Sequence, residues 1–310
     1  MIEPSLGATL DHLGKEGVVG RFRIVSHGRL QDWIAAEKGY FADEGLDYEF
    51  DVVLLQNADQ SVTVGTGGVR TGAYELYRSK GRGKSDMSCA CHWAVNQAAV
   101  DSYGRMWGHA YSVIPSAIYV HPGSAASGPG DLAGVEVAVG FHSGSHFSTI
   151  QALEAFLEPS AVKLGFIGMP YDRVDALLDG KVQAAAIWGS ATYLVEQLGC
   201  RKVADSTFMA AFLFDGNIDR RDVERYFTAL RRAQLDLDLE PERYKHHYLD
   251  EIPPRFHDRI DIRGFGPGER VVFLPYTQEM YERSQDWMRS HGLFEDAVGS
   301  IPEYETVVEV

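Results

Sequence analysis

Short apolar runs alternate with segments of helical periodicity along the first hundred residues. Residues 21–26 are typical of a short strand, and apolar residues then recur at helical spacing from Leu30 until Gly39 ends the segment. A second strand is predicted over 46–55 and a third apolar segment over 87–93. Strands that alternate with helices in this way predict a parallel sheet wrapped by helices.

The alternation continues through the rest of the chain. Further strands are predicted over 112–120, 135–139, 184–188 and 209–214. Helices are predicted over 146–157, 174–180 and 191–198, and three amphipathic helices follow Arg221. We expect the strand over 112–120 to carry the chain into a second lobe and the strand over 209–214 to carry it back. The predicted domains are a discontinuous lobe I, residues 1–108 plus 208–310, and a lobe II, residues 109–207.

Composition and net charge limit the kinds of molecule that this protein can bind. A chain of 310 residues with 45% hydrophobic residues is long enough for two domains, each with its own core. Its 44 acidic and 29 basic residues leave a net charge of −15, which disfavours nucleic acid and anionic membranes as partners. No apolar run approaches the roughly 20 residues that span a bilayer. An anionic ligand must therefore be captured by local donors in a cleft.

The N-terminus and the cysteines bear on the compartment. Residues 1–17 lack the basic start, the apolar run and the cleavage site of a signal peptide. Cys89, Cys91 and Cys200 are too few for a disulfide framework, and an odd count suits a reducing compartment. We expect a cytoplasmic location, or a periplasmic one if the sequence is a mature form whose signal has been removed.

Residues 33–47, Trp-Ile-Ala-Ala-Glu-Lys-Gly-Tyr-Phe-Ala-Asp-Glu-Gly-Leu-Asp, resemble the opening helix of the nitrate/sulfonate/taurine solute-binding proteins. The segments 131–140, 143–146 and 179–188 resemble that family's entry into lobe II, its Gly/Ser anion loop and its strand that ends in Trp. The resemblance covers about residues 21–290. It implies the bilobed α/β fold of type 2 periplasmic binding proteins, with two mixed, mostly parallel sheets flanked by helices and a ligand cleft between the lobes.

The same resemblance extends to two intracellular enzymes, a sulfinate desulfinase and the thiamine pyrimidine synthase. The nucleophilic cysteine of the desulfinase follows the first strand, where this chain has Ser26 and His27. Nothing in the chain matches the Cys-rich run of the pyrimidine synthase. Two functions therefore stay open. One is an intracellular lyase or hydrolase, desulfinase-like or decarboxylase-like, that acts on a small anionic organic molecule; the other is a non-catalytic solute-binding protein, whose partner would be an ABC permease. The missing export signal favours the enzyme.

Ligands of open α/β sheets bind beyond the carboxyl ends of the strands, and four predicted strand ends here carry polar or nucleophilic side chains. The candidate ligand contacts are Ser26, His27, His92, His142, Ser143, Gly144, Ser145, His146, Trp188 and Tyr193. The segment 143–145 precedes a helix, whose unpaired N–H groups and dipole favour an anion. The alternative is that Ser145 only caps a helix that begins at His146.

The catalytic candidates are Cys89, Cys91, His27 and His146. A cysteine becomes a good nucleophile where a neighbouring His or positive charge lowers its pKa; the alternative is that both cysteines are small buried hydrophobes. On an extended strand Cys89 and Cys91 face one side and His92 the other. We expect no cofactor and no metal. The alternative metal site, for zinc or iron, would use His27, Cys91, His92, His142 and His146.

Overall fold

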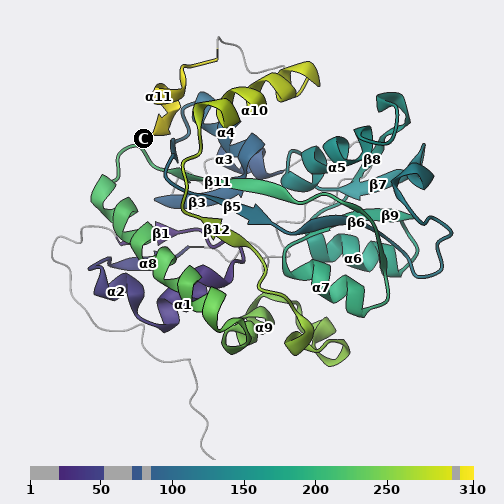
Figure 1. The fold of residues 1–310 in the computed structure, drawn as a ribbon, viewed down its shortest axis with the longest axis horizontal. Helices are drawn as coiled ribbons and strands as arrows, with labels where there is room; N and C mark the ends of the chain where they lie inside the picture. The colour runs from purple at the N-terminus through teal and green to yellow at the C-terminus, as the bar shows by residue number, and fades with distance from the viewer. Residues whose placement is uncertain (1–20, 52–71, 79–84, 295–300) are drawn as a thin grey trace, which may run out of the picture.

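The computed structural model of the chain describes residues 21–51, 72–78, 85–294 and 301–310. Two β-sheets lie side by side (Figure 1). The larger sheet contains β1 (Phe22–Ile24), β2 (Tyr48–Phe50), β3 (Met87–Cys91), β4 (Arg105–Trp107), β5 (Tyr111–Ile114), β11 (Phe208–Phe214), β12 (Arg270–Val272) and β13 (Val308–Glu309). The smaller sheet contains β6 (Ser116–Val120), β7 (Glu136–Val139), β8 (Lys163–Phe166), β9 (Ala184–Trp188) and β10 (Arg201–Asp205). The bilobed α/β fold expected from the sequence is thus confirmed.

Helices cover both faces of each sheet. They are α1 (Leu30–Glu37), α2 (Tyr40–Asp43), α3 (Ala73–Arg78), α4 (His92–Val100), α5 (Gly144–Glu154), α6 (Pro170–Leu178), α7 (Ser190–Gln197), α8 (Arg220–Leu239), α9 (Tyr248–Glu251), α10 (Gln278–Ser290) and α11 (Tyr304–Val307). On the larger sheet α1, α2 and α8 pack on one face and α3, α4 and α10 on the other; α5 covers one face of the smaller sheet, and α6 and α7 cover the opposite face (Figure 1). Within the described residues, no helix has both the length and the apolar character that crossing a membrane requires.

Each of the two sheets contains both parallel and antiparallel strands. The larger sheet runs β12-β5-β11-β3-β1-β2, with β4 joined to β11 and β13, and the smaller runs β10-β6-β9-β7-β8. The first three strands are parallel neighbours, as their alternation with helices predicted, whereas β11 and β6 run antiparallel to the strands beside them. The predicted second strand is shorter than expected within the described residues, and positions 52–55 lie outside them.

Pro115 divides the strand predicted over 112–120 into two strands of different sheets. β5 ends before Pro115 in the larger sheet and β6 begins after it in the smaller one. Proline has no amide hydrogen, so it interrupts the ladder at this point. The return crossing lies alongside, since the Oγ atoms of Ser116 and Ser206 are 2.9 Å apart. The predicted boundary at residue 109 therefore precedes β5, which belongs to the larger sheet.

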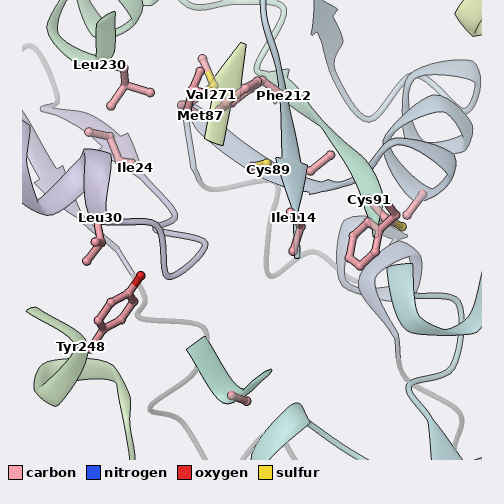
Figure 2. Close-up of a cluster of buried hydrophobic side chains, with 14 of the residues drawn as sticks. Ile24, Leu30, Met87, Cys89, Cys91, Ile114, Phe212, Leu230, Tyr248 and Val271 are labelled. Atoms are coloured by element: carbon pink, nitrogen blue, oxygen red, sulfur yellow. The ribbon is translucent and has the colours of Figure 1, made fainter. Parts of the chain in front are cut away.

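The core of the larger sheet is apolar and includes two of the cysteines. Apolar side chains of β1, β3, β11, α1 and α8 form one buried cluster, and Figure 2 shows Cys89 of β3 among them. All the cysteines, Cys89, Cys91 and Cys200, are free and buried. Burying a Leu or Phe side chain stabilises a fold by about 1.5–3 kcal/mol, whereas a buried charge is costly unless it is paired. A charged side chain within such a core therefore needs a partner that offsets the cost of its burial.

Candidate functional site

The loop after β1 brings a charged group into this core. His27, Arg29 and Glu269 are each more than nine-tenths buried. His27 Nδ1 lies 3.1 Å from Glu269 Oε2, and Arg29 Nε lies 3.6 Å from Glu269 Oε1. The hydroxyl of Ser112 on β5 donates to Glu269 Oε1 at 2.5 Å. The carboxylate is thus held from three sides, as a charge removed from water requires.

Cys89 completes this constellation. A ring nitrogen of His27, Cys89 Sγ and a carboxylate oxygen of Glu269 all lie within 4.8 Å of one another, and these three residues are named here the Cys–His–Glu group. β1 and β3 are parallel neighbours, which brings Cys89 beside the loop that follows β1. Sequence reasoning singled out His27 and Cys89 but missed Glu269. No local signal could have found Glu269, because it lies 242 positions from His27 along the chain.

Burial and neighbouring charges act in opposite directions on the ionisation of the Cys–His–Glu group. Burial raises the pKa of Glu269, but the charges of Arg29 and His27 lower it by more than burial raises it, and the resulting pKa is about 2. Burial raises the pKa of the Cys89 thiol to about 12, although Arg29 acts to lower it. At neutral pH the group therefore combines an ionised carboxylate with a protonated thiol, and the thiol needs a base before it can react.

Arg29 lies beside the group as a fixed positive charge. Its Cζ is 4.6 Å from the centroid of the Phe212 ring, and its Nε is 3.4 Å from Asp32 Oδ2. Tyr226 donates a hydrogen bond of 2.8 Å to the other oxygen of Asp32. Burial lowers the pKa of Arg29, but its interactions with Cys89, Glu269 and Asp32 outweigh this effect and raise the pKa. A permanent cation here repels a divalent ion, so the Cys–His–Glu group fits acid–base chemistry better than metal ligation.

Lobe II contributes Trp188 to the same place. The rings of His27 and Trp188 are stacked, with centroids 5.2 Å apart and planes inclined by 10°. Trp188 is the last residue of β9, and Gly189 follows with a φ of 65°, a conformation that favours glycine and lets the chain turn sharply into α7. The structure thus brings together two side chains that the sequence placed on separate strand ends.

Tyr193 of α7 holds the segment that presents Glu269. Its hydroxyl oxygen accepts a hydrogen bond of 3.1 Å from the Gly268 amide, and its ring packs against Phe265 with centroids 5.3 Å apart. A Cβ on Gly266 would lie 2.7 Å from the Tyr193 hydroxyl, so this segment approaches α7 closely. Since Gly268 directly precedes Glu269, lobe II supports both sides of the Cys–His–Glu group.

The Gly/Ser loop before α5 is built differently from the sequence prediction. The helix begins at Gly144, and the N-cap residue Ser143 makes no side-chain capping hydrogen bond. The alternative in which Ser145 caps a helix that begins at His146 is therefore wrong. Ser145 Oγ accepts a hydrogen bond of 2.9 Å from the Gly140 amide, and Ser143 Oγ donates one of 2.7 Å to the Gly140 carbonyl. Both hydroxyls shape the loop in front of the helix.

A buried guanidinium lies behind this loop. Arg173 donates hydrogen bonds to the carbonyl oxygens of Ile167, Gly168 and Ala186. Its Nη2 is buried without an acceptor among the described residues, and a Cβ on Gly140 would lie 3.2 Å from its Nη1. Burial lowers the pKa of Arg173 to about 9, because it outweighs the charge of Asp172, which acts to raise the pKa. The α5 N-terminus and a buried cation partnered by carbonyl oxygens together create a local preference for an anion.

The histidines of this loop have partners of their own. His142 Nδ1 lies 2.5 Å from Glu75 Oε1 of α3, so it connects lobe II to the opposite lobe. The His142 amide donates a hydrogen bond of 3.3 Å to His146 Nδ1. The ring of His146 lies against Phe141 and Phe166, at centroid distances of 6.0 and 5.1 Å. His146 is thus part of an aromatic cluster beside the α5 N-terminus.

The remaining predicted residues lie apart from the Cys–His–Glu group or shape its backbone. His92 is buried between α4 and α10, with Nδ1 3.0 Å from Ser284 Oγ, and burial lowers its pKa to about 3. Cys91 lies farther along β3 than Cys89 (Figure 2) and is the N-cap residue of α4. Ser26 Oγ accepts a hydrogen bond of 3.4 Å from the Gly28 amide.

The alternative metal site predicted from the sequence is not assembled. Its proposed ligands are His27, Cys91, His92, His142 and His146. Among the described residues, the groups of three or more ligating side chains are the Cys–His–Glu group and a group on the surface, Glu37, His246 and His247. The side chains of His92 and His27 face different clusters, because the start of α4 turns His92 toward α10.

Comparison with known proteins supports the class of fold. No protein-family model matches the chain, and no curated protein sequence matches it. The alkanesulfonate-binding protein SsuA from Xanthomonas axonopodis pv. citri, bound to MOPS, is 15% identical; the alignment covers 93% of this chain and 98% of that chain, with a TM-score of 0.65. The aliphatic sulphonate-binding protein SsuA from Escherichia coli is 13% identical over 94% and 92% of the two chains, with a TM-score of 0.64.

A desulfurization enzyme shares the same architecture. DSZB is 14% identical to this chain, over 93% of this chain and 96% of that one, with a TM-score of 0.56. At such identities a structural likeness establishes the fold alone. The chain therefore has the bilobed fold of the type 2 periplasmic binding proteins, as the sequence resemblance implied.

Proposed function

We propose that this protein is an enzyme that cleaves a bond in a small organic acid held between its lobes. The reaction class is that of a lyase or hydrolase, with desulfination or decarboxylation as the expected type. The observation that carries the proposal is the Cys–His–Glu group, buried where His27 of one lobe meets Trp188 of the other. A thiol, an imidazole and a carboxylate in mutual reach are the parts of a nucleophile, its base and the group that orients the base.

Each member of the group has a distinct part in this chemistry. Glu269, ionised at neutral pH, accepts a hydrogen bond from the Nδ1–H of His27 and so leaves Nε2 as the base. His27 removes the Cys89 proton, and Arg29 stabilises the thiolate that forms. The sulfur then bonds to the electrophilic atom of the acid while the bond to the leaving group breaks, and the leaving group takes the proton from His27. A water molecule hydrolyses the fragment from Cys89 and restores the thiol.

The Gly/Ser loop supplies a place for the charged end of the substrate. β7 and β9 are parallel neighbours, so the loop after β7 and Trp188 at the end of β9 lie at the same edge of the smaller sheet. The α5 N-terminus and the buried Arg173 favour a carboxylate, sulfinate or sulfonate there. Among the structural neighbours, one SsuA has MOPS bound and a DSZB variant has biphenyl-2-sulfinic acid bound. Ligands of these classes are therefore the first to try.

A non-catalytic solute-binding protein of an ABC importer is the second candidate. The observation that favours it is the pKa of about 12 for Cys89, which keeps the thiol protonated. In that case His27, Trp188 and the Gly/Ser loop would contact the ligand without reacting with it. The two candidate functions differ in one property, which is whether the protein releases the bound acid without chemical change.

The experiment starts from the purified full-length protein. Small molecules released by denaturation are identified by mass spectrometry, and panels of sulfinates, sulfonates and carboxylates are then incubated with the protein while release of sulfite, sulfate or carbon dioxide is measured. Cys89→Ser should retain ligand binding and lose turnover at least a hundredfold, whereas the matched variant Cys91→Ser should retain both. An unmodified protein that binds an acid tightly and returns it intact would establish the binding-protein alternative.

A further inference from the structure

A second group of ligating side chains lies on the surface at the end of α1. Glu37 is the last residue of α1, and His246 and His247 belong to a 3₁₀ turn, Lys245–His247, that packs against this helix. Glu37 Oε2 lies 2.8 Å from His247 Nε2 and 3.4 Å from His246 Nε2. One ligand atom from each of the three residues lies within 4.8 Å of the others.

The imidazole nitrogens that face away from Glu37 also have oxygen atoms near them. His246 Nδ1 lies 3.1 Å from the Arg243 carbonyl oxygen, and His247 Nδ1 lies 3.7 Å from Asp250 Oδ2. A carbonyl oxygen only accepts hydrogen bonds, so the Arg243 carbonyl favours a proton on His246 Nδ1 and leaves Nε2 as the nitrogen that can bind an ion. Metal-bound histidines in proteins are oriented in this way, by a carbonyl or a carboxylate on the nitrogen that does not bind the ion.

The electrostatic surroundings also favour a cation. The C-terminal end of a helix carries partial negative charge, and the last turn of α1 contains no basic residue. Two lysines adjoin these ligands in sequence: Lys38, which is exposed at the end of α1, and Lys245, whose Nζ is occupied by Glu242 and the Arg263 carbonyl. His246 and Glu37 are partly exposed, with 54% and 37% of their side-chain surfaces accessible, so an ion can reach them.

We propose that Glu37, His246 and His247 form a binding site for a divalent transition-metal ion, with Zn²⁺ as the expected occupant. Zinc bonds of about 2.0–2.2 Å to nitrogen and oxygen place tetrahedral ligand atoms about 3.3 Å apart, and the two Glu37 distances lie on either side of that value. Because Glu37 and His246 are partly exposed, a water molecule can supply the fourth ligand. Two imidazoles and one carboxylate prefer zinc to calcium or magnesium.

The ion would tie the end of α1 to the segment before α9. α1 starts directly after Arg29 and carries Asp32, so it supports the buried charges beside the Cys–His–Glu group. Trp33, one turn before Glu37, donates its indole N–H to Glu251 of α9 at 2.8 Å. A metal link at Glu37 therefore reinforces a contact that already joins these elements. This site stands independently of the catalytic proposal, because it shares no residue with it.

Zinc binding to the tag-free full-length protein tests the proposal. Titration with ZnCl₂ by isothermal calorimetry should show one site, and saturating Zn²⁺ should raise the melting temperature. His247→Ala should weaken this binding at least tenfold, and His246→Ala and Glu37→Gln should also weaken it. His121→Ala, which removes an exposed histidine of lobe II, serves as the matched control and should bind zinc as the unmodified protein does.

Three outcomes would overturn the proposal. The first is that the unmodified protein binds no Zn²⁺ at micromolar concentration, and the second is that His247→Ala binds it with unchanged affinity. The third is that Cys89→Ser removes the binding while His247→Ala does not, which would place the ion in the Cys–His–Glu group. Since turnover is not measured in these titrations, failure of the metal site and failure of the catalytic proposal remain distinguishable.

Discussion

The imidazole of His27 stacks on the indole of Trp188, with ring centroids 5.2 Å apart, although the two residues extend from different sheets. The Nδ1 atom of the same imidazole lies 3.1 Å from Glu269 Oε2. One side chain of the candidate site is therefore also a point where the two lobes touch. Any change in the packing of the lobes will move or expose the base of the proposed reaction.

Replacing Trp188 should loosen the site without removing its chemistry. An aromatic pair contributes about 0.5–1.5 kcal/mol beyond its buried area, which corresponds to roughly a tenfold effect on a rate or affinity. Trp188→Ala should speed dissociation of the bound acid about tenfold, whereas Trp188→Phe, which keeps a stacking ring, should change it much less. Stopped-flow measurement of ligand release compares the two variants. Equal dissociation rates for Ala and Phe would show that the stack does not retain the ligand.

Glu269→Gln should destabilise the protein as well as stop turnover. The substitution keeps the shape of the side chain but removes one of the two carboxylates beside the buried Arg29, and breaking a buried ion pair costs about 3–5 kcal/mol. Denaturant unfolding at pH 7 measures the loss. Glu303→Gln, a change at an exposed carboxylate, is the control and should unfold like the parent. An unchanged midpoint for Glu269→Gln would mean that the ion pair with Asp32 is sufficient for Arg29.

The pKa of Glu269 predicts how the free energy of unfolding depends on pH below 4.5. Its pKa is about 2 in the folded protein, below the ordinary value of 4.5 for glutamate. Glu269 therefore contributes stability that is present above pH 4.5 and is lost as the pH falls from 4.5 through 2. The unfolding free energy of Glu269→Gln should fall less steeply over this range than that of the parent. Parallel curves would contradict the assignment of Glu269 as a stabilised anion.

The pKa of Glu251 predicts that the free energy of unfolding changes with pH in the opposite direction, at higher pH. Burial raises its pKa to about 8, although the hydrogen bond from Trp33 lowers it, so the carboxyl is protonated in the folded protein where an exposed glutamate has ionised. The stability tied to this group is fully present below pH 4.5 and is lost as the pH rises from 4.5 through 8. Glu251→Gln cannot ionise, so its stability relative to the parent should increase across this range. A constant difference from pH 5 to pH 8 would contradict the raised pKa.

Gly144→Ala should strain the contact between the lobes. A Cβ at this position would lie 2.3 Å from two atoms of the Phe208 ring, which belongs to β11 of the larger sheet. Overpacking of this kind costs about 1–3 kcal/mol. Gly216→Ala is the matched control, because a Cβ there would meet nothing within 4 Å. Thermal melts should show a lower midpoint for Gly144→Ala alone, and identical midpoints would mean that the lobes adjust freely.

The Gly/Ser loop and Pro115 show where local sequence rules reach their limit. The loop was found from its composition, but the start of α5 lies two positions earlier than expected, because Ser143 and Ser145 bond to Gly140 instead of capping the helix. Pro115 was visible in the sequence, yet a proline in an apolar run does not reveal that the strands on either side join different sheets. Both features depend on which neighbours the backbone meets after folding.

The sequence by itself determined the alternation of strands and helices and the presence of His27 and Cys89 near strand ends, because these follow from spacing along one segment of chain. Its resemblance to the solute-binding proteins implied the bilobed α/β class. Only the tertiary structure decided which polar groups meet. Glu269 reaches His27 from the far end of the chain, and Arg173 is buried behind the anion loop with carbonyl oxygens as partners. A side chain's partners and pKa depend on what packs against it in space, and residues that meet only after folding share no pattern along the chain.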